Sequence, residues 1–204
     1  MKIKDIQSIV NRIIEELVPN FTQKGLLIVS PISDGILRGF SFEGSSFNKE
    51  SFYVDVFVQP LYVPGEVIDF NLGRRILGEN SSDRWELNEK NVFEKLFFAI
   101  KSQGLPVVNV ETPEALCSWI DSLPPVGDVY SKQAKAYSLA YTGRFDEAIA
   151  ELASLKLALD LKVPWMVVID QRADQLLELL RKNPSSVNEK MKVWSKETLG
   201  RLKL

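Results

Sequence analysis

In the stretch Ser51–Pro64, SFYVDVFVQPLYVP, the alternation of side-chain types predicts a β-strand, because neighbouring residues of a strand point to opposite faces of a sheet. One face would carry Phe52, Val54, Val56 and Val58, and the other would carry Tyr53, Asp55, Phe57 and Gln59. Large apolar groups on both faces predict an inner strand. Proline has no N–H to donate to a neighbouring strand, so Pro60 and Pro64 are expected to end the regular pairing.

Two further apolar runs, at residues 26–31 and 35–44, flank the turn-forming Ser33-Asp34-Gly35 and predict a β-hairpin. With the strand in the stretch 51–64 they form an antiparallel meander. The segment from Val67 to Leu72 is the candidate fourth strand, and PVVNV at 106–110 is a candidate short edge strand. The glycines, serines and Asn80 of residues 72–85 predict an exposed loop between them.

Apolar residues spaced three and four positions apart predict a helix over residues 3–18 and another that begins after Asn88 and ends near Gly104. Thr112-Pro113 is a typical helix start. Further along, residues 134–141 and 145–159 predict a helical hairpin around Thr142-Gly143-Arg144. The last two helices are expected to begin at Pro164 and after Ser186, where Glu189 completes a capping-box spacing and the final helix reaches about Leu199.

The prolines and glycine of residues 123–127 mark the best candidate domain boundary. We therefore predict an α+β domain over residues 1–124, with an antiparallel sheet of three to five strands packed by helices. An all-helical C-terminal region of about four helices would follow over residues 125–204.

The charge balance narrows the partners that this chain is expected to bind. With 25 Lys and Arg against 27 Asp and Glu, the net charge of −2 argues against a general affinity for nucleic acid. The N-terminal helix contains acids, unlike a secretory signal, and no run approaches the ~18 apolar residues of a membrane span. The single Cys117 lies in an apolar helical pattern and is expected to be buried and inert. A cytoplasmic protein that binds neither membranes nor nucleic acid is the expectation.

The absence of histidine excludes Ser-His-Asp and Cys-His catalysis and HExxH zinc sites. Neither a phosphate-binding P-loop nor a dinucleotide-binding glycine motif occurs, so no cofactor is expected. A metal-dependent nuclease-like enzyme stays open, since carboxylates on adjacent strands can converge on Mg²⁺; its candidate residues are Asp34, Glu43, Asp55 and Gln59. Alternatively, Asp55 is a charge at the sheet edge or an ion-pair partner of Arg38 on the next strand.

The segment YSLAYTGRFDEAIAEL resembles a tetratricopeptide helix pair within residues 128–160, through Ala136, Gly143, Phe145, Ala148 and Leu152. Lys135 and Leu155 depart from the pattern, and only one unit matches, whereas a stable array needs about three. A generic helical hairpin is the alternative explanation. The resemblance implies a peptide-binding groove, and hence a helical adaptor.

The order of elements over residues 1–123, with FVQPLYVP, LGRRILG and Trp85, resembles small uncharacterised bacterial α+β domains that are similar to immunity proteins of toxin systems. This resemblance implies binding rather than catalysis. The leading hypothesis is therefore a non-enzymatic protein-binding module whose partner is another protein, with a toxin as the specific candidate.

Aromatic and arginine side chains on loops dominate the energetics of many interfaces. The candidate partner-binding residues are therefore Tyr62, Arg74, Arg75 and Trp85. In the alternative interpretation, Tyr62 and Trp85 fill the end of the sheet, and the two arginines are solvated.

Overall fold

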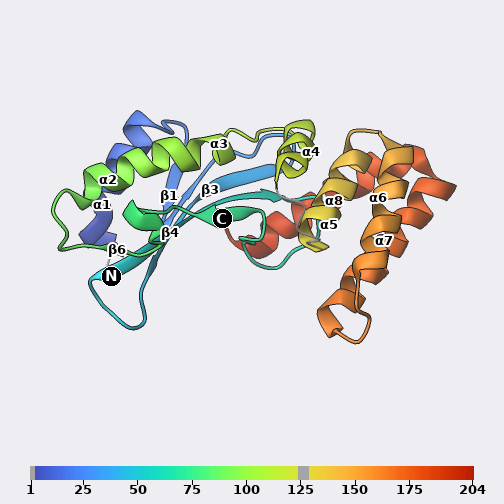
Figure 1. Ribbon diagram of the computed structural model, residues 1–204. Helices are drawn as coiled ribbons and strands as arrows, with labels where there is room; N and C mark the ends of the chain where they lie inside the picture. Colours follow the sequence, from blue (N-terminus) through green and yellow to red (C-terminus); the bar gives the residue numbers. More distant parts are fainter. Residues whose placement is uncertain (1–2, 124–128) are drawn as a thin grey trace. The chain divides into compact units, whose positions relative to one another are not determined.

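The structure is a computed structural model that describes residues 3–123 and 129–204 of the chain. It has an α+β fold, with an antiparallel sheet and packed helices followed by an all-helical C-terminal region, which confirms the predicted fold class (Figure 1). None of the helices in these described ranges is long and apolar enough to cross a membrane.

The chain forms two compact units that are not simply consecutive in sequence. Unit 1 comprises Met1–Ser33, Leu37–Gln59 and Asp69–Glu111, and unit 2 comprises Asp34–Ile36, Pro60–Ile68 and Thr112–Leu204. The predicted boundary between residues 124 and 125 lies outside the described residues. Two short segments of the N-terminal half, at 34–36 and 60–68, therefore belong with the helices of unit 2.

The described residues form a six-stranded sheet in the order β1-β2-β3-β4-β5, with β6 also paired to β4. The strands are β1 (Thr22–Lys24), β2 (Leu27–Val29), β3 (Ile36–Gly44), β4 (Ser51–Pro60), β5 (Gly73–Arg75) and β6 (Trp85–Glu86). The long strand β4 has neighbours on both sides, which confirms the predicted inner strand, and it ends at Pro60. The antiparallel pairing of β2 with β3 confirms the predicted hairpin.

The predicted strand at 67–72 is wrong, because pairing with β4 begins only at Gly73, opposite Phe57. A β-carbon at position 73 would lie 2.2 Å from the Val56 carbonyl oxygen, so this close pairing requires glycine. Strand β5 therefore lies inside the segment that the sequence predicted as a loop.

The predicted edge strand at 106–110 is also wrong. Helix α2 (Val92–Ala99), the π-helical turn η2 (Ile100–Gly104) and α3 (Leu105–Val108) follow one another without a break. Gly104 has a helical φ of −85° rather than a left-handed cap conformation. A β-carbon there would lie 2.5 Å from the Phe40 ring, so Gly104 permits close helix–sheet packing instead of ending the helix.

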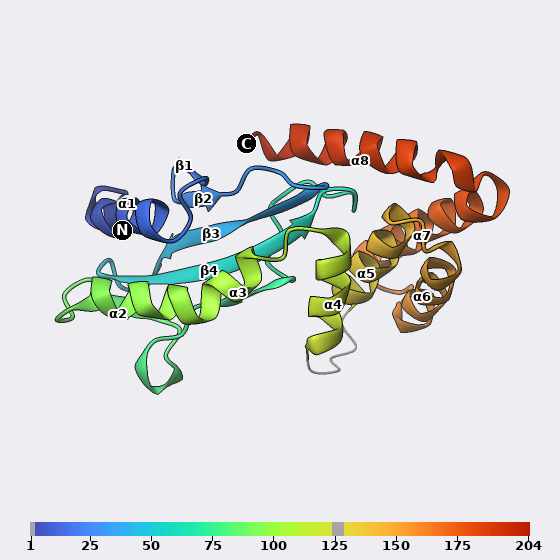
Figure 2. The same ribbon diagram turned by 90° about the horizontal axis from the view of Figure 1, so that it is seen from above.

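The helices of unit 1 cover one face of the sheet (Figure 2), the face that carries the valines of β4 and most of the phenylalanines of the sheet. Helix α1 (Ile3–Glu16) confirms the N-terminal prediction, and its Ile6, Ile9 and Ile13 are buried. The Arg12 guanidinium lies 4.1 Å from the centre of the Phe97 ring and joins α1 to α2. Burial of each such aliphatic side chain contributes about 1.5–3 kcal/mol, which makes this face the core of unit 1.

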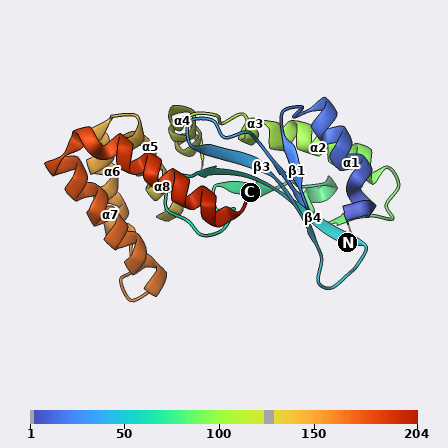
Figure 3. The ribbon, with the colours of Figure 1, turned by 180° about the vertical axis from the view of Figure 1, so that it is seen from behind.

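Unit 2 contains the packed helices of the C-terminal region (Figure 3). They are α4 (Pro113–Ser122), α5 (Val129–Tyr141), α6 (Phe145–Ala158), α7 (Pro164–Lys182) and α8 (Val187–Leu202). Thr112 Oγ1 accepts a hydrogen bond from the Ala115 N–H and confirms the predicted cap. The capping box at Ser186 is wrong, because its hydroxyl donates to the Asn183 carbonyl at 3.0 Å instead.

The segment at 60–68 is bonded to the helices of unit 2. Arg172 donates to the Pro64 carbonyl at 2.8 Å, and the Gly65 N–H donates to Thr198 Oγ1 at 3.3 Å. Tyr62 is buried against Tyr141, with ring centres 4.6 Å apart. The segment is thus an integral part of the core of unit 2.

Candidate binding site on the polar face of the sheet

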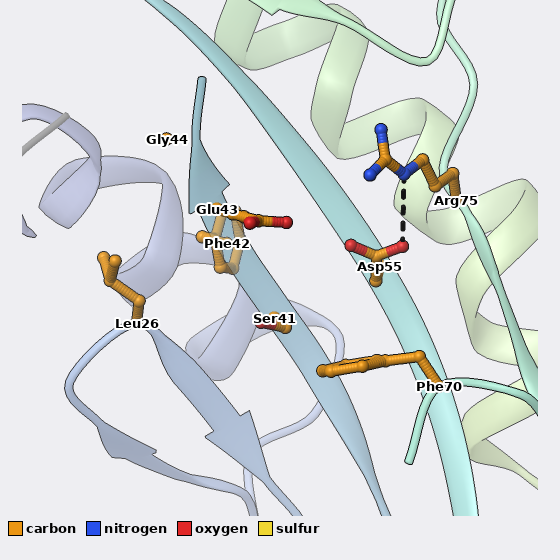
Figure 4. A pocket seen from close by; sticks show the side chains of 8 residues that line it. All are labelled: Leu26, Ser41, Phe42, Glu43, Gly44, Asp55, Phe70 and Arg75. Carbon is orange, nitrogen blue, oxygen red and sulfur yellow. Dashed lines mark ion pairs between the residues drawn. The ribbon is translucent and has the colours of Figure 1, made fainter. Parts of the chain in front are cut away.

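A pocket of about 400 Å³ opens on the second face of the sheet, within unit 1 (Figure 4). We call it the sheet groove. Strand β3 contributes four consecutive residues, β4 and β5 contribute one each, and two come from flanking loops. Its lining residues are Leu26, Ser41, Phe42, Glu43, Gly44, Asp55, Phe70 and Arg75.

Asp55 and Arg75 form the central ion pair of the sheet groove. They lie directly opposite each other on β4 and β5, and Arg75 Nε is 3.6 Å from Asp55 Oδ1. The Asp55 side chain is only 17% exposed. The expected pairing of Asp55 with Arg38 is wrong, because Arg38 lies on the helix-covered face and bonds to the Val108 carbonyl and to Glu111.

Two further contacts hold the Arg75 guanidinium in place. It stacks on the Tyr53 ring at 4.1 Å from the ring centre, and its Nη1 donates to Asp83 Oδ2 at 2.8 Å. The side chain nevertheless stays 38% exposed. Arg75 therefore presents an oriented cation at the surface without needing to be ordered by a ligand.

The groove carries more negative than positive charge. Burial raises the pKa of Asp55 above the usual 3.8; Arg75 opposes the shift, while the negative charges of Glu43 and Asp83 add to it. For Arg75, burial acts against the charge, but the hydrogen bond to Asp83 and the surrounding carboxylates raise the pKa overall. Three carboxylates thus surround one guanidinium, and an additional cation would be favoured there.

An aromatic pair borders the charged part of the groove. The Phe70 ring packs edge-on against Phe57 with centres 5.5 Å apart, and 41% of Phe70 stays exposed. Phe57 can lie across β3 because position 39 is glycine, where a β-carbon would be 3.0 Å from the ring. The groove thus combines an apolar edge with a charged centre, an arrangement typical of binding sites.

The structure separates the four residues predicted to contact a partner. Arg75 lines the groove, whereas the adjacent Arg74 points to the other face and donates to the Gln103 carbonyl at 2.6 Å. Tyr62 and Trp85 are buried, and Trp85 Nε1 donates to the Ile76 carbonyl at 3.0 Å. The expectation that these two aromatics face a partner is corrected, because each ring fills a core.

The carboxylates considered for a metal-dependent enzyme are not brought together. Among residues 3–123 and 129–204, no three His, Cys, Asp or Glu side chains are grouped so that they could hold a metal ion. Asp34 belongs to unit 2, and Gln59 accepts a hydrogen bond from the Asp69 N–H. Glu43 and Asp55 share the groove, but two carboxylates alone do not form such a group.

Cys117 is buried, as predicted. Burial raises the pKa of its thiol, and the nearby Arg144 and Lys135 only partly oppose that shift. The neutral thiol is a poor nucleophile, so this environment favours the inert interpretation.

Sequence reasoning missed several residues of this site. In the sequence, Ser41 and Glu43 alternate with Phe40 and Phe42, but nothing in that pattern links Ser41 to Arg75. Phe70 lay in a segment predicted as a strand, and it gave no signal of a binding role.

Comparison with protein-family models, with curated proteins and with solved structures finds no match to this chain.

Proposed function

We propose that the protein is a non-enzymatic protein-binding module that receives a basic side chain of its partner in the sheet groove. The observation that carries this proposal is the ordered arrangement of one arginine among Glu43, Asp55 and Asp83, beside the exposed edge of Phe70. A lysine or arginine from a partner would balance the excess negative charge. Oriented arginines and aromatic rings at partly exposed positions are also typical of interface hot spots.

The shape of the groove favours a protein over a small molecule. Pockets for small ligands usually enclose most of the ligand surface. Here Glu43 is exposed, and Arg75 and Phe70 are both more than a third exposed, so the groove is shallow. A protein surface can cover such a groove from outside. Neutralisation of a toxin by an immunity-type protein is the specific form of this proposal.

Replacement of Asp55 by asparagine tests the groove directly. We expect the Asp55→Asn protein to bind its co-purified partner at least about tenfold more weakly, because the neutral amide leaves a basic partner side chain without its counter-charge. Isothermal titration of the purified pair measures the affinity. The free energy of unfolding should change by less than about 1 kcal/mol, since the ion pair is partly exposed and Arg75 keeps its bond to Asp83.

A matched control is Asp146→Asn, an equally conservative change at an exposed position on α6. This variant should bind the partner like the wild type. Equal affinities for the two variants and the wild type would contradict the groove proposal.

The affinity should also fall as the pH is lowered. Because burial raises the pKa of Asp55 above 3.8, its carboxylate is neutralised at a higher pH than that of an exposed aspartate. The sign for stability is opposite: the folded state binds this proton more tightly, so protonation of Asp55 favours folding. Titrations over a series of acidic pH values should therefore show weaker binding before unfolding, and Asp55→Asn should flatten the profile. A pH-independent affinity of the wild type would contradict this expectation.

A helical adaptor is the second candidate, because apolar side chains are exposed where α6 ends and α7 begins. Leu157 is 90% exposed, and Leu161, Trp165 and Val168 are exposed as well. Trp165 is oriented by stacking on Tyr130, with ring centres 5.3 Å apart. In the same titration, Leu157→Ser would weaken binding if this region contacts the partner, and it would have no effect if the sheet groove is the site.

A further inference from the structure

The loop that joins β3 to β4 displays an almost completely exposed phenylalanine. Phe47 is 98% exposed. The loop, which spans residues 45–50, extends beyond the paired part of these strands (Figure 1). A phenyl ring carries a large apolar surface, so burial of this exposed ring against a partner would stabilise a complex.

This loop is ordered by its own hydrogen bonds, so Phe47 is presented in a defined position. Ser45 Oγ accepts from the N–H groups of Phe47 and Asn48 at 3.2 and 3.3 Å. Asn48 Oδ1 accepts from the Glu50 N–H at 3.0 Å, and the Ser51 N–H donates to the Asn48 carbonyl at 3.1 Å. A side chain held this way loses little backbone entropy on binding, which is the property of a preorganised anchor.

Contacts outside the loop fix it to the rest of unit 1. The Asn48 side-chain amide donates to Glu86 at 3.3 Å, and that of Asn88 donates to Glu50 at 2.9 Å. These bonds use the polar side chains of the loop and leave its one aromatic ring outside. The loop therefore holds the Phe47 ring in solvent and does not pack it into the hydrophobic core.

The charges around Phe47 indicate which surface it would meet. Near the loop there are three acidic residues, Glu43, Glu50 and Glu86, and two basic ones, Lys49 and Arg84. Glu43 and Gly44 also line the sheet groove, where Asp55 and Asp83 lie around Arg75. The loop and the groove together therefore carry an excess of two negative charges. An anionic membrane would be repelled by this surface, whereas a protein with basic residues around an apolar pocket would be attracted.

We propose that Phe47 is an anchor that inserts into an apolar pocket of a partner protein, and that the rim of this pocket carries lysine or arginine. One of these basic residues enters the sheet groove, so both contacts belong to one interface. This inference rests on the proposed protein-binding function and adds the chemistry of the partner surface.

A photo-crosslinking experiment on the full chain tests this anchor. p-Benzoylphenylalanine at position 47 is activated by light in the cells that produce the protein, and the same group at position 98 serves as the control. Phe98 is an exposed phenylalanine that lies on α2 and not on the loop. We expect a cross-link from position 47 to a different protein, at a peptide that lines an apolar pocket with basic residues around it.

The cross-linked partner is then purified and titrated with variants. Phe47→Ser should weaken binding at least about tenfold, as expected for a central aromatic anchor, and Phe98→Ser should not. A cross-link only to a second copy of this chain, or none at position 47, would overturn the proposal. So would binding of the wild type, but not Phe47→Ser, to vesicles of equal parts phosphatidylcholine and phosphatidylserine.

Failure of the anchor and failure of the proposed function give different results. If Asp55→Asn weakens binding while Phe47→Ser leaves it unchanged, the groove is the contact and the anchor is refuted. If neither substitution changes the affinity for any cross-linked protein, the proposed function fails together with the anchor.

Discussion

Replacing Tyr62 by alanine is expected to lower the free energy of unfolding of unit 2 by about 3–5 kcal/mol. Tyr62 is fully buried, its ring stacks on Tyr141, and its hydroxyl lies 2.7 Å from Ser138 Oγ. Truncation would leave a cavity at the place where the segment 60–68 joins the helices. Urea denaturation followed by the helical circular-dichroism signal measures the loss.

Phenylalanine at position 62 is the matched control. It keeps the stacked ring and removes only the hydroxyl, and Ser138 Oγ still has the Ala134 carbonyl at 2.7 Å to donate to. We expect a loss of about 0.5–1.5 kcal/mol. If alanine cost no more than phenylalanine does, the stacked and fully buried position of Tyr62 would be contradicted.

The behaviour of Tyr62 shows why aromatic residues were misleading as predictors of a contact surface. A tyrosine after a strand, between two prolines, has the same local pattern whether it meets a partner or fills a core. Its burial depends on Ser138 and Tyr141, which are more than seventy positions away in the sequence. Trp85 is similar, because its indole N–H is satisfied by the carbonyl of Ile76.

Local pattern predicted the long elements well. The alternation of residues 52–59 lies within β4, which ends at Pro60, and the helix start at Thr112-Pro113 was confirmed with its hydrogen bond. It failed at PVVNV, where β-branched residues favour a strand but the chain is helical as far as Val108. There the close contact between Gly104 and Phe40 outweighs local preference, and no short stretch of sequence contains that contact.

Local pattern also predicted part of the sheet groove, but not how its residues are paired. Asp55 was recognised as the ambiguous residue of its strand, and Arg75 as a candidate contact. Their pairing requires the register of β4 with β5, and β5 lies in a segment rich in loop-forming residues. That register also separates Arg75 from Arg74, since adjacent residues of a strand face opposite sides. Phe47 was missed because its neighbours are typical of a polar connection.

Replacing Gly39 by alanine is expected to cost about 3 kcal/mol or more, because position 39 has no space for a methyl group. The new β-carbon would lie 2.1 Å from the Ile28 carbonyl oxygen and 3.0 Å from the Phe57 ring. The first contact is with the backbone of the paired strand β2, and the second is with a fully buried ring. Neither group can move aside without separating β2 from β3 or displacing Phe57.

The same substitution should also weaken partner binding in any protein that still folds. Phe57 supports Phe70 at the edge of the sheet groove, so its displacement would disturb the site from below. Ser41→Ala, two positions along the same face and half-buried, is the control for stability alone and should change the free energy of unfolding by about 0.5 kcal/mol or less. Thermal unfolding and titration with the partner measure both effects. If Gly39→Ala unfolded like Ser41→Ala, the close approach of β2 and Phe57 to position 39 would be refuted, because an added methyl group there must displace one of them.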